Sequence, residues 1–246
     1  PVAALHSRTR SVASGRPALG RFAIGVPGSA LVYAAEDAPA QVRDRLEHLA
    51  RARGADFDAL EVRLIVEPSL RLDRAEDLAR LRATLERHRP RLLVLDPYVR
   101  LQRADENNAT EVAAILGALR ELSRTFNLAI VLVHHARKGG DLGEGLRGSS
   151  DFHAWGDSNL YLRRHDEALV LTIEDGHAAG PETLKLALVG DDRHSHLEIV
   201  TADTGADALL TLRDQPCDCV VLDLRLPDMS GFEVLDRLRN DEALSN

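Results

Sequence analysis

The sequence predicts an α/β fold, a mostly parallel sheet with helices on both faces and an antiparallel edge, followed by a smaller α/β unit. Continuous apolar strands alternate with amphipathic helices over residues 30–136, a pattern typical of a parallel sheet covered on both faces. Short strands without intervening helices follow, which indicates antiparallel hairpins. The tail has a different composition: residues 1–190 carry 26 acidic and 26 basic side chains, whereas residues 191–246 carry 13 and 5. We therefore expect two units of different origin, 1–190 and 191–246.

The spacing of apolar residues, together with the Gly and Pro residues that end helices, predicts the strands and helices of the first unit. Apolar runs predict parallel strands, and apolar residues at helical spacing, closed by Gly54 or Pro90, predict helices. The predicted strands are 30–37, 62–67, 91–99 and 128–136, and the predicted helices are 38–54, 74–90 and 108–127. A Gly-rich loop at 137–150 is too polar to pack, and loops of this kind are usually functional or mobile. The antiparallel strands are expected near 158–163, 168–174 and 184–189.

Composition excludes several classes of protein. No apolar run approaches the ~20 residues of a membrane span, and no secretion signal is recognisable, so we expect no membrane partner. Cys217 and Cys219 are the only cysteines, which fits a reducing cytoplasm. The neutral first unit argues against a broad electrostatic face for DNA.

Reactive side chains stand where the predicted parallel strands end, which is where ligands bind in such sheets. Glu36 and Asp37 end the first strand, Asp96 ends "LLVLD", and His134 and His135 end a later strand. Asp96 suits a carboxylate that holds a Mg²⁺-bound water beside a triphosphate, although an Asp capping the next turn is as common. Glu36 could activate a water, whereas Asp37 before "APAQ" is expected to cap the following helix.

The histidines have two interpretations. His134 and His135 could ligate a metal, but with no third ligand in view we expect one to be structural and the other to sense the site. His194 and His196 are a further possible metal pair, and a solvated loop is the favoured interpretation.

Four segments, in order, carry a resemblance to a known family. "VYAAEDAPAQVRDRL", "LLVLDPYVRL", "LAIVLVHHARKGG" and "LRGSSDFHAWGDS" resemble the RecA-like ATPases of the plasmid-replication RepA helicase type over about residues 11–190. The resemblance implies ATP and Mg²⁺ as cofactors, single-stranded DNA as a partner and a homo-oligomeric ring such as a hexamer. It implies these roles: Glu36 as the base, Asp96 as the Walker B carboxylate for Mg²⁺, His135 as the residue coupling the site to DNA, Arg45 and Arg147 at subunit junctions, and Arg137 and Lys138 in contact with single-stranded DNA.

The stretch "GRPALGRF", residues 15–22, has nearly the spacing of a phosphate loop, G-x-x-x-x-G-K-[ST]. Arg21 and Phe22 replace the Lys and the hydroxyl residue, and Pro17 removes a backbone N–H from the cradle. The resemblance places "SVASGRP" at the end of the first helix, and the family's lysine would fall at or before Pro1. We expect the phosphate loop and its strand to be missing, with weak or no ATP hydrolysis.

The tail resembles the middle of a response-regulator receiver domain, a flavodoxin-like βαβα fragment over about residues 198–241. "VVLDLRLPDMSGFEVL" places Asp223 where that family takes phosphate from a histidine kinase. Asp191 and Asp192 mimic the acidic pair that holds Mg²⁺, but they precede Asp223 by only about 31 residues, which leaves no room for the usual first helix. We therefore expect Asp223 not to be phosphorylated.

The sequence thus predicts a helicase- or replication-type ATPase domain, truncated and joined to a partial receiver. Two other classes remain open. One is a non-catalytic RecA-fold module that binds nucleic acid or a partner, and the other is a two-component signalling protein with a receiver phosphorylated at Asp223.

Overall fold

A computed structural model describes residues 9–52, 54–67, 69–102, 109–134, 149–165, 168–175, 181–190, 195–199, 202, 204–214, 222 and 225–240. The chain divides into two compact units, Pro1–Ile199 and Val200–Asn246, and from here on these ranges are called the first and the second unit. In the described part of the chain, no helix is both long and apolar enough to span a membrane.

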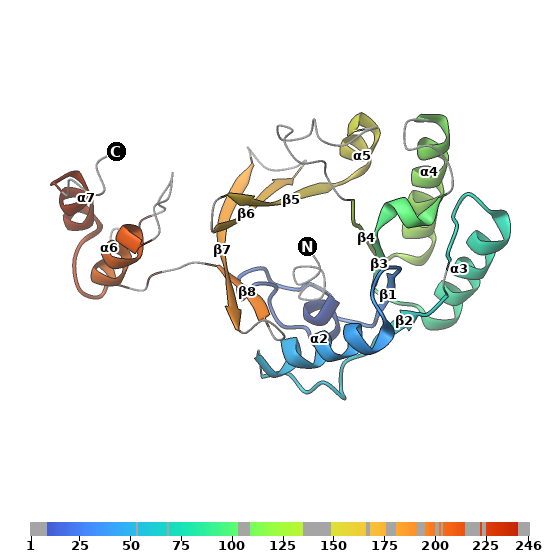
Figure 1. Ribbon diagram of the computed structural model, residues 1–246, viewed down its shortest axis with the longest axis horizontal. Coiled ribbons are helices and arrows are strands. Elements are labelled where there is room, and N and C mark those ends of the chain that lie inside the picture. Colours follow the sequence, from blue (N-terminus) through green and yellow to red (C-terminus); the bar gives the residue numbers. More distant parts are fainter. Residues whose placement is uncertain are drawn as a thin grey trace. The chain divides into compact units, whose positions relative to one another are not determined.

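The first unit contains a parallel sheet with the strand order β2-β1-β3-β4 (Figure 1). Its strands are β1 (Ala30–Ala34), β2 (Val62–Ile65), β3 (Leu92–Asp96) and β4 (Ala129–Leu132). The helices of this part are α2 (Pro39–Ala52), α3 (Ala75–His88) and α4 (Ala109–Phe126), with residues 9–14 also helical. A 3-10 helix, η1 (Tyr98–Leu101), follows β3. The predicted alternation of strands and helices is confirmed, and the elements end within a few residues of the expected bounds.

Both faces of the parallel sheet are covered because its central strands are apolar on both sides. Leu31, Tyr33, Leu93 and Leu95 face the buried leucines of α3 and α4 in the largest core cluster. Ala30, Val32, Leu92 and Val94 form the opposite face, against which Val12 of the first helical segment packs. This core fixes the carboxyl ends of β1 and β3 side by side.

The antiparallel strands are confirmed, and among the described residues they form a sheet of their own. Its order is β5-β6-β7-β8 (Figure 1), with β5 at Ser158–His165, β6 at Ala168–Asp175, β7 at Glu182–Gly190 and β8 at Ser195–Ile199. Helix α5 (Ser149–Trp155) precedes this sheet. Leu171, Leu184, Leu186 and Leu197 form its buried face, against which Leu19 and Phe22 pack.

The second unit contains two helices in its described residues, α6 (Gly205–Asp214) and α7 (Gly231–Asn240). Ser230 and Glu233 form a reciprocal capping box at the start of α7: the Ser230 N–H donates to Glu233 Oε2 at 2.8 Å, and the Glu233 N–H donates to Ser230 Oγ at 3.2 Å.

Asp228 caps α6, although it lies more than 20 positions away in the sequence. The backbone N–H groups of Gly205 and Ala206, at the start of α6, donate to its two carboxylate oxygens at 2.7 and 2.9 Å. The bond from Ala206 and the bond from Gly205 favour the ionised carboxylate and hold the pKa of Asp228 below its ordinary value. The "LPDMSG" loop is thereby tied to the N-terminus of α6.

This contact predicts a pH-dependent effect of Asp228→Asn. A carboxyl group with a lowered folded-state pKa stabilises the fold above its unfolded pKa, and the stabilisation is lost as pH falls through the folded value. Amide protection in α6 is therefore expected to be weaker in Asp228→Asn than in the wild type at neutral pH, with the difference shrinking below about pH 4. Hydrogen exchange measures the protection of the α6 amides. Asp236→Asn, at an exposed position of α7, is the control and should leave that protection unchanged. An effect of Asp228→Asn that does not depend on pH would contradict the capping role.

Candidate active site at the carboxyl edge of the parallel sheet

Three neighbouring strands end together at one edge of the parallel sheet. Ala34 of β1 is aligned with Asp96 of β3, and the Ala35 N–H donates to the Asp96 carbonyl oxygen at 2.9 Å. On the other side of β3, the Val133 N–H donates to the Leu95 carbonyl oxygen at 3.0 Å. The predicted site residues Glu36, Asp96 and His134 therefore lie at or just beyond the carboxyl ends of adjacent strands.

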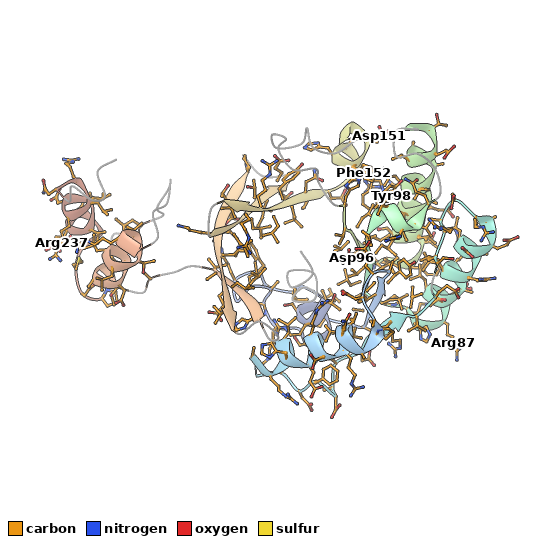
Figure 2. All side chains as sticks on the ribbon, viewed as in Figure 1. Arg87, Asp96, Tyr98, Asp151, Phe152 and Arg237 are labelled. Atoms are coloured by element: carbon orange, nitrogen blue, oxygen red, sulfur yellow. The ribbon has the colours of Figure 1, made fainter. Side chains whose placement is uncertain are left out.

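Asp96 is the most enclosed acidic residue of this edge. It is the last residue of β3, and only 8% of its surface is exposed. Figure 2 shows it at the end of the sheet, near Tyr98 of η1. A largely buried carboxylate at the carboxyl end of a parallel strand fits a Mg²⁺ ligand, since hard cations prefer oxygen donors. The position and burial of the Asp96 carboxylate thus fit a ligand of the predicted Mg²⁺.

Glu36 is more exposed and is held by an arginine that sequence reasoning missed. Arg100 Nε donates to Glu36 Oε1 at 3.1 Å, and both side chains are about half exposed. Arg100 lies on η1, four residues beyond Asp96. The predicted base, the predicted metal ligand and Arg100 are thereby gathered at one edge.

Asp37 does not cap α2 through its side chain. Its carboxylate instead accepts a hydrogen bond from Arg45 Nη1 at 2.6 Å, two turns along the helix. The predicted cap is wrong because an arginine on the same side of α2 reaches the carboxylate. Arg45 thus forms an ion pair within its own chain. Its predicted place at a subunit junction stays a prediction.

His134 belongs to a cluster of rings at the end of β4. Its ring stacks on Tyr98 with centroids 5.9 Å apart and meets Phe152 of α5 edge-on at 5.0 Å. Tyr98 and Phe152, labelled in Figure 2, are themselves in edge contact at 4.7 Å. This half-buried His134 fits the structural role expected for one of the two histidines.

The segment at 15–22 is not a phosphate cradle. Its N–H groups do not converge on one point: Ala18 and Phe22 exchange backbone hydrogen bonds of 2.8 and 2.9 Å in a tight turn. Arg21 pairs with Glu182 of β7 at 2.6 Å, so the turn is pinned to the antiparallel sheet. The interpretation of this stretch as a linker after the first helix agrees with this geometry.

His196 lies on strand β8 rather than in a solvated loop, so that expectation is wrong for this residue. Its Nε2 is 2.9 Å from Glu198 Oε1, and its ring is 6.3 Å from that of His48 on α2. Within the described ranges, no three His, Cys, Asp or Glu side chains are grouped as metal ligands.

Several predicted site residues lie outside the described residues, and their roles stay predictions. They are His135, Arg137, Lys138, Arg147, Asp191, Asp192, His194 and Asp223.

A parallel α/β core with two carboxylates at the carboxyl ends of adjacent strands has the arrangement at which open α/β sheets bind ligands. A family model described as an AAA domain matches residues 5–141, more than half of the chain, and the chain belongs to this family. A second model, described as a response regulator receiver domain, matches residues 170–245.

Two solved structures resemble the chain. The chain resembles a DnaB-like replicative helicase, solved in a study of its interactions with primase (TM-score 0.53, 12% identity, 68% of this chain and 50% of that chain). It also resembles the RadB recombinase (TM-score 0.53, 15% identity, 71% of this chain and 80% of that chain). These likenesses show the fold.

The curated relatives are described as transcriptional regulatory proteins, TcrX as a probable one. KdpE of Mycobacterium tuberculosis is 42% identical over 71 residues, 29% of this chain and 29% of its own. TcrX of the same species is 37% identical over 81 residues, 32% of this chain and 33% of its own. AfsQ1 of Streptomyces coelicolor is 41% identical over 75 residues, 30% of this chain and 31% of its own. The chain thus spans a third or less of the length of each of these relatives.

The receiver match begins inside the antiparallel sheet of the first unit. Strands β7 and β8 fall within the matched residues, yet they pair antiparallel with each other, and β7 also pairs with β6. Only residues 191–194 connect them, and parallel neighbours need a crossover of roughly a dozen residues. Four residues leave no room for the first helix of a receiver, so β7 and β8 can only form a hairpin. For this reason β8, where the receiver fragment was expected to begin, belongs to the antiparallel sheet of the first unit.

Proposed function

We propose that the first unit is a nucleotide-binding module of the helicase or recombinase type, which uses MgATP and acts on single-stranded DNA. One observation carries the proposal: Glu36 and Asp96 lie at the carboxyl ends of adjacent parallel strands, with Asp96 buried and Glu36 exposed. Two carboxylates in such different surroundings suit two tasks, metal binding for the enclosed one and water activation for the open one.

In this proposal Asp96 and Glu36 act from the places described above. Asp96 holds Mg²⁺, whose charge offsets that of the phosphates when the ion is bound. Glu36 orients a water and accepts its proton. From the family resemblance, His135 couples this edge to DNA, and Arg137 and Lys138 contact the strand. Arg45 and Arg147 lie at subunit junctions of a ring, where one of them reaches a neighbour's phosphate.

The printed sequence contains no G-x-x-x-x-G-K-[ST] motif, so the strongest contact with the β- and γ-phosphates is not supplied by these 246 residues. We propose that they bind MgATP weakly and hydrolyse it slowly or not at all. The test is whether Mg²⁺-dependent binding of a fluorescent ATP analogue is lost in Asp96→Ala. Binding that is unchanged in Asp96→Ala, or equal without Mg²⁺, would contradict it.

A signalling protein is the second candidate, favoured by the receiver match. Asp223 would accept phosphate from a histidine kinase, which would be the partner. This candidate requires Mg²⁺-dependent labelling by acetyl phosphate that disappears in Asp223→Asn. We rank it lower because β7, after which the acidic pair would stand, pairs with β6 and β8 in the first unit.

A further inference from the structure

We propose that Arg100 is a positioning residue that holds Glu36 while no nucleotide is bound and exchanges it for the terminal phosphate of a nucleoside triphosphate. This inference rests on the proposed function and adds to it a residue that reads the γ-phosphate.

The turn that carries Arg100 is firmly anchored. Tyr98 and Leu101, three residues apart on η1, are both fully buried. The Tyr98 N–H donates to the Val133 carbonyl oxygen at 2.7 Å, and the Leu72 N–H donates to the Leu101 carbonyl oxygen at 2.7 Å. Because a 3-10 helix has three residues per turn, burying its first and fourth residues leaves the two between them outward. Val99 and Arg100 are accordingly exposed.

The contact between Arg100 and Glu36 is of a kind that is easily exchanged. It is a single hydrogen bond of 3.1 Å, with 58% of the Arg100 side chain and 50% of the Glu36 side chain exposed. Exposed ion pairs of this kind contribute little to stability, since water and salt screen them. A rigid turn with a long, weakly held arginine therefore suits a residue that changes partner.

The arrangement of the edge brings a terminal phosphate within reach of Arg100. A water activated by Glu36 has to lie within hydrogen-bonding distance of that carboxylate and about 3–3.5 Å from the phosphorus it attacks. A guanidinium 3.1 Å from Glu36 is then a near neighbour of the phosphate oxygens. Arginine binds phosphate through two parallel N–H bonds, which a single contact with Glu36 does not match. Exchange would also release Glu36 to hold the water.

The experiment compares the affinities of MgATPγS and MgADP for the full chain and for Arg100→Gln. Arg82→Gln is the matched control, because Arg82 forms a surface pair with Glu121 at 2.5 Å, between α3 and α4. We expect Arg100→Gln to weaken ATPγS binding by roughly tenfold, the size of one charge-assisted hydrogen bond, and to change ADP binding by less than about twofold. Arg82→Gln should leave both affinities unchanged.

A second pair of variants separates exchange from simple charge repulsion. If Glu36 competes with the phosphate for Arg100, Glu36→Gln tightens ATPγS binding in the wild-type background and does so much less when Arg100 is already glutamine. An equal gain in both backgrounds would show that Glu36 acts by repulsion alone and would overturn the exchange.

The remaining outcomes are also decisive. Equal weakening of ATPγS and ADP by Arg100→Gln would assign Arg100 a structural role, and no weakening of either would remove it from the site. If the wild-type chain binds neither nucleotide, the proposed function fails together with the exchange, and that result is distinguishable because it needs no variant.

Discussion

Tyr98→Ala is expected to destabilise the first unit by about 3–5 kcal/mol, the range for removing a buried aromatic side chain. Tyr98 is fully buried and joins three parts of the edge: its ring contacts His134 of the β4 end and Phe152 of α5, and its hydroxyl donates to Gln102 Oε1 at 3.0 Å. Its loss leaves a cavity under η1, which carries Arg100. Urea denaturation followed by the fluorescence of Trp155, the single tryptophan, measures the change.

Two neighbouring variants calibrate this result. Tyr98→Phe keeps the ring and loses only the hydroxyl, so a cost of about 1–3 kcal/mol is expected for depriving the buried Gln102 of its donor. Val99→Ala, at an exposed position of the same turn, should lie within about 0.5 kcal/mol of the wild type. A Tyr98→Ala variant as stable as Val99→Ala would show that the ring cluster does not hold the edge together.

Gly205→Ala is expected to destabilise the second unit by about 1–3 kcal/mol, the usual cost of overpacking. A Cβ at this position would lie 2.4 Å from Met229 Cγ and 2.9 Å from Cγ2 of the buried Val234. Met229 is flexible and can move, whereas the β-branched Val234 is stiff. Amide hydrogen exchange in α6 and α7 measures the effect without interference from the first unit.

Gly117→Ala is the matched control, and it is expected to raise stability where Gly205→Ala lowers it. Gly117 lies inside α4, and a Cβ there meets nothing within 4 Å. Replacing a helix-interior glycine by alanine should stabilise the first unit by about 0.5–1 kcal/mol. Gly205→Ala with Met229→Ala should recover part of the loss. Equal protection of α6 in Gly205→Ala and the wild type would contradict the close contact between Gly205 and α7.

The central strands could be predicted because their signal is local. β1 and β3 are unbroken apolar runs, and an acid at or just beyond each strand end marks the edge where a parallel sheet binds ligands. The local signal failed for β8. The pattern indicates a solvated loop around His196 and a strand only from about residue 198, and it does not say which sheet that strand joins; the four-residue connection to β7 decides that.

The contacts of the site were less predictable because they join distant residues. The Glu36–Arg100 pair spans 64 positions, and nothing in the sequence around Arg100 distinguishes it from the other arginines. The buried Tyr98 and Leu101, three residues apart, are the one signal that could have indicated an anchored turn there. Asp37 had the spacing of a helix cap, and the nearby Arg45 outweighed that preference with a charged partner.

Paramagnetic relaxation by Mn²⁺ tests the central claim, that Asp96 and Glu36 mark a metal–nucleotide site, most directly. Mn²⁺ replaces Mg²⁺ at oxygen sites and broadens nearby amide resonances of the ¹⁵N-labelled chain in the presence of ATP. The account predicts broadening that is stronger at the carboxyl ends of β1 and β3, at Ala35 and Asp96, than at their amino ends, Ala30 and Leu92, and that is lost in Asp96→Ala. Broadening that spares Ala35 and Asp96, or persists there in Asp96→Ala, would contradict it.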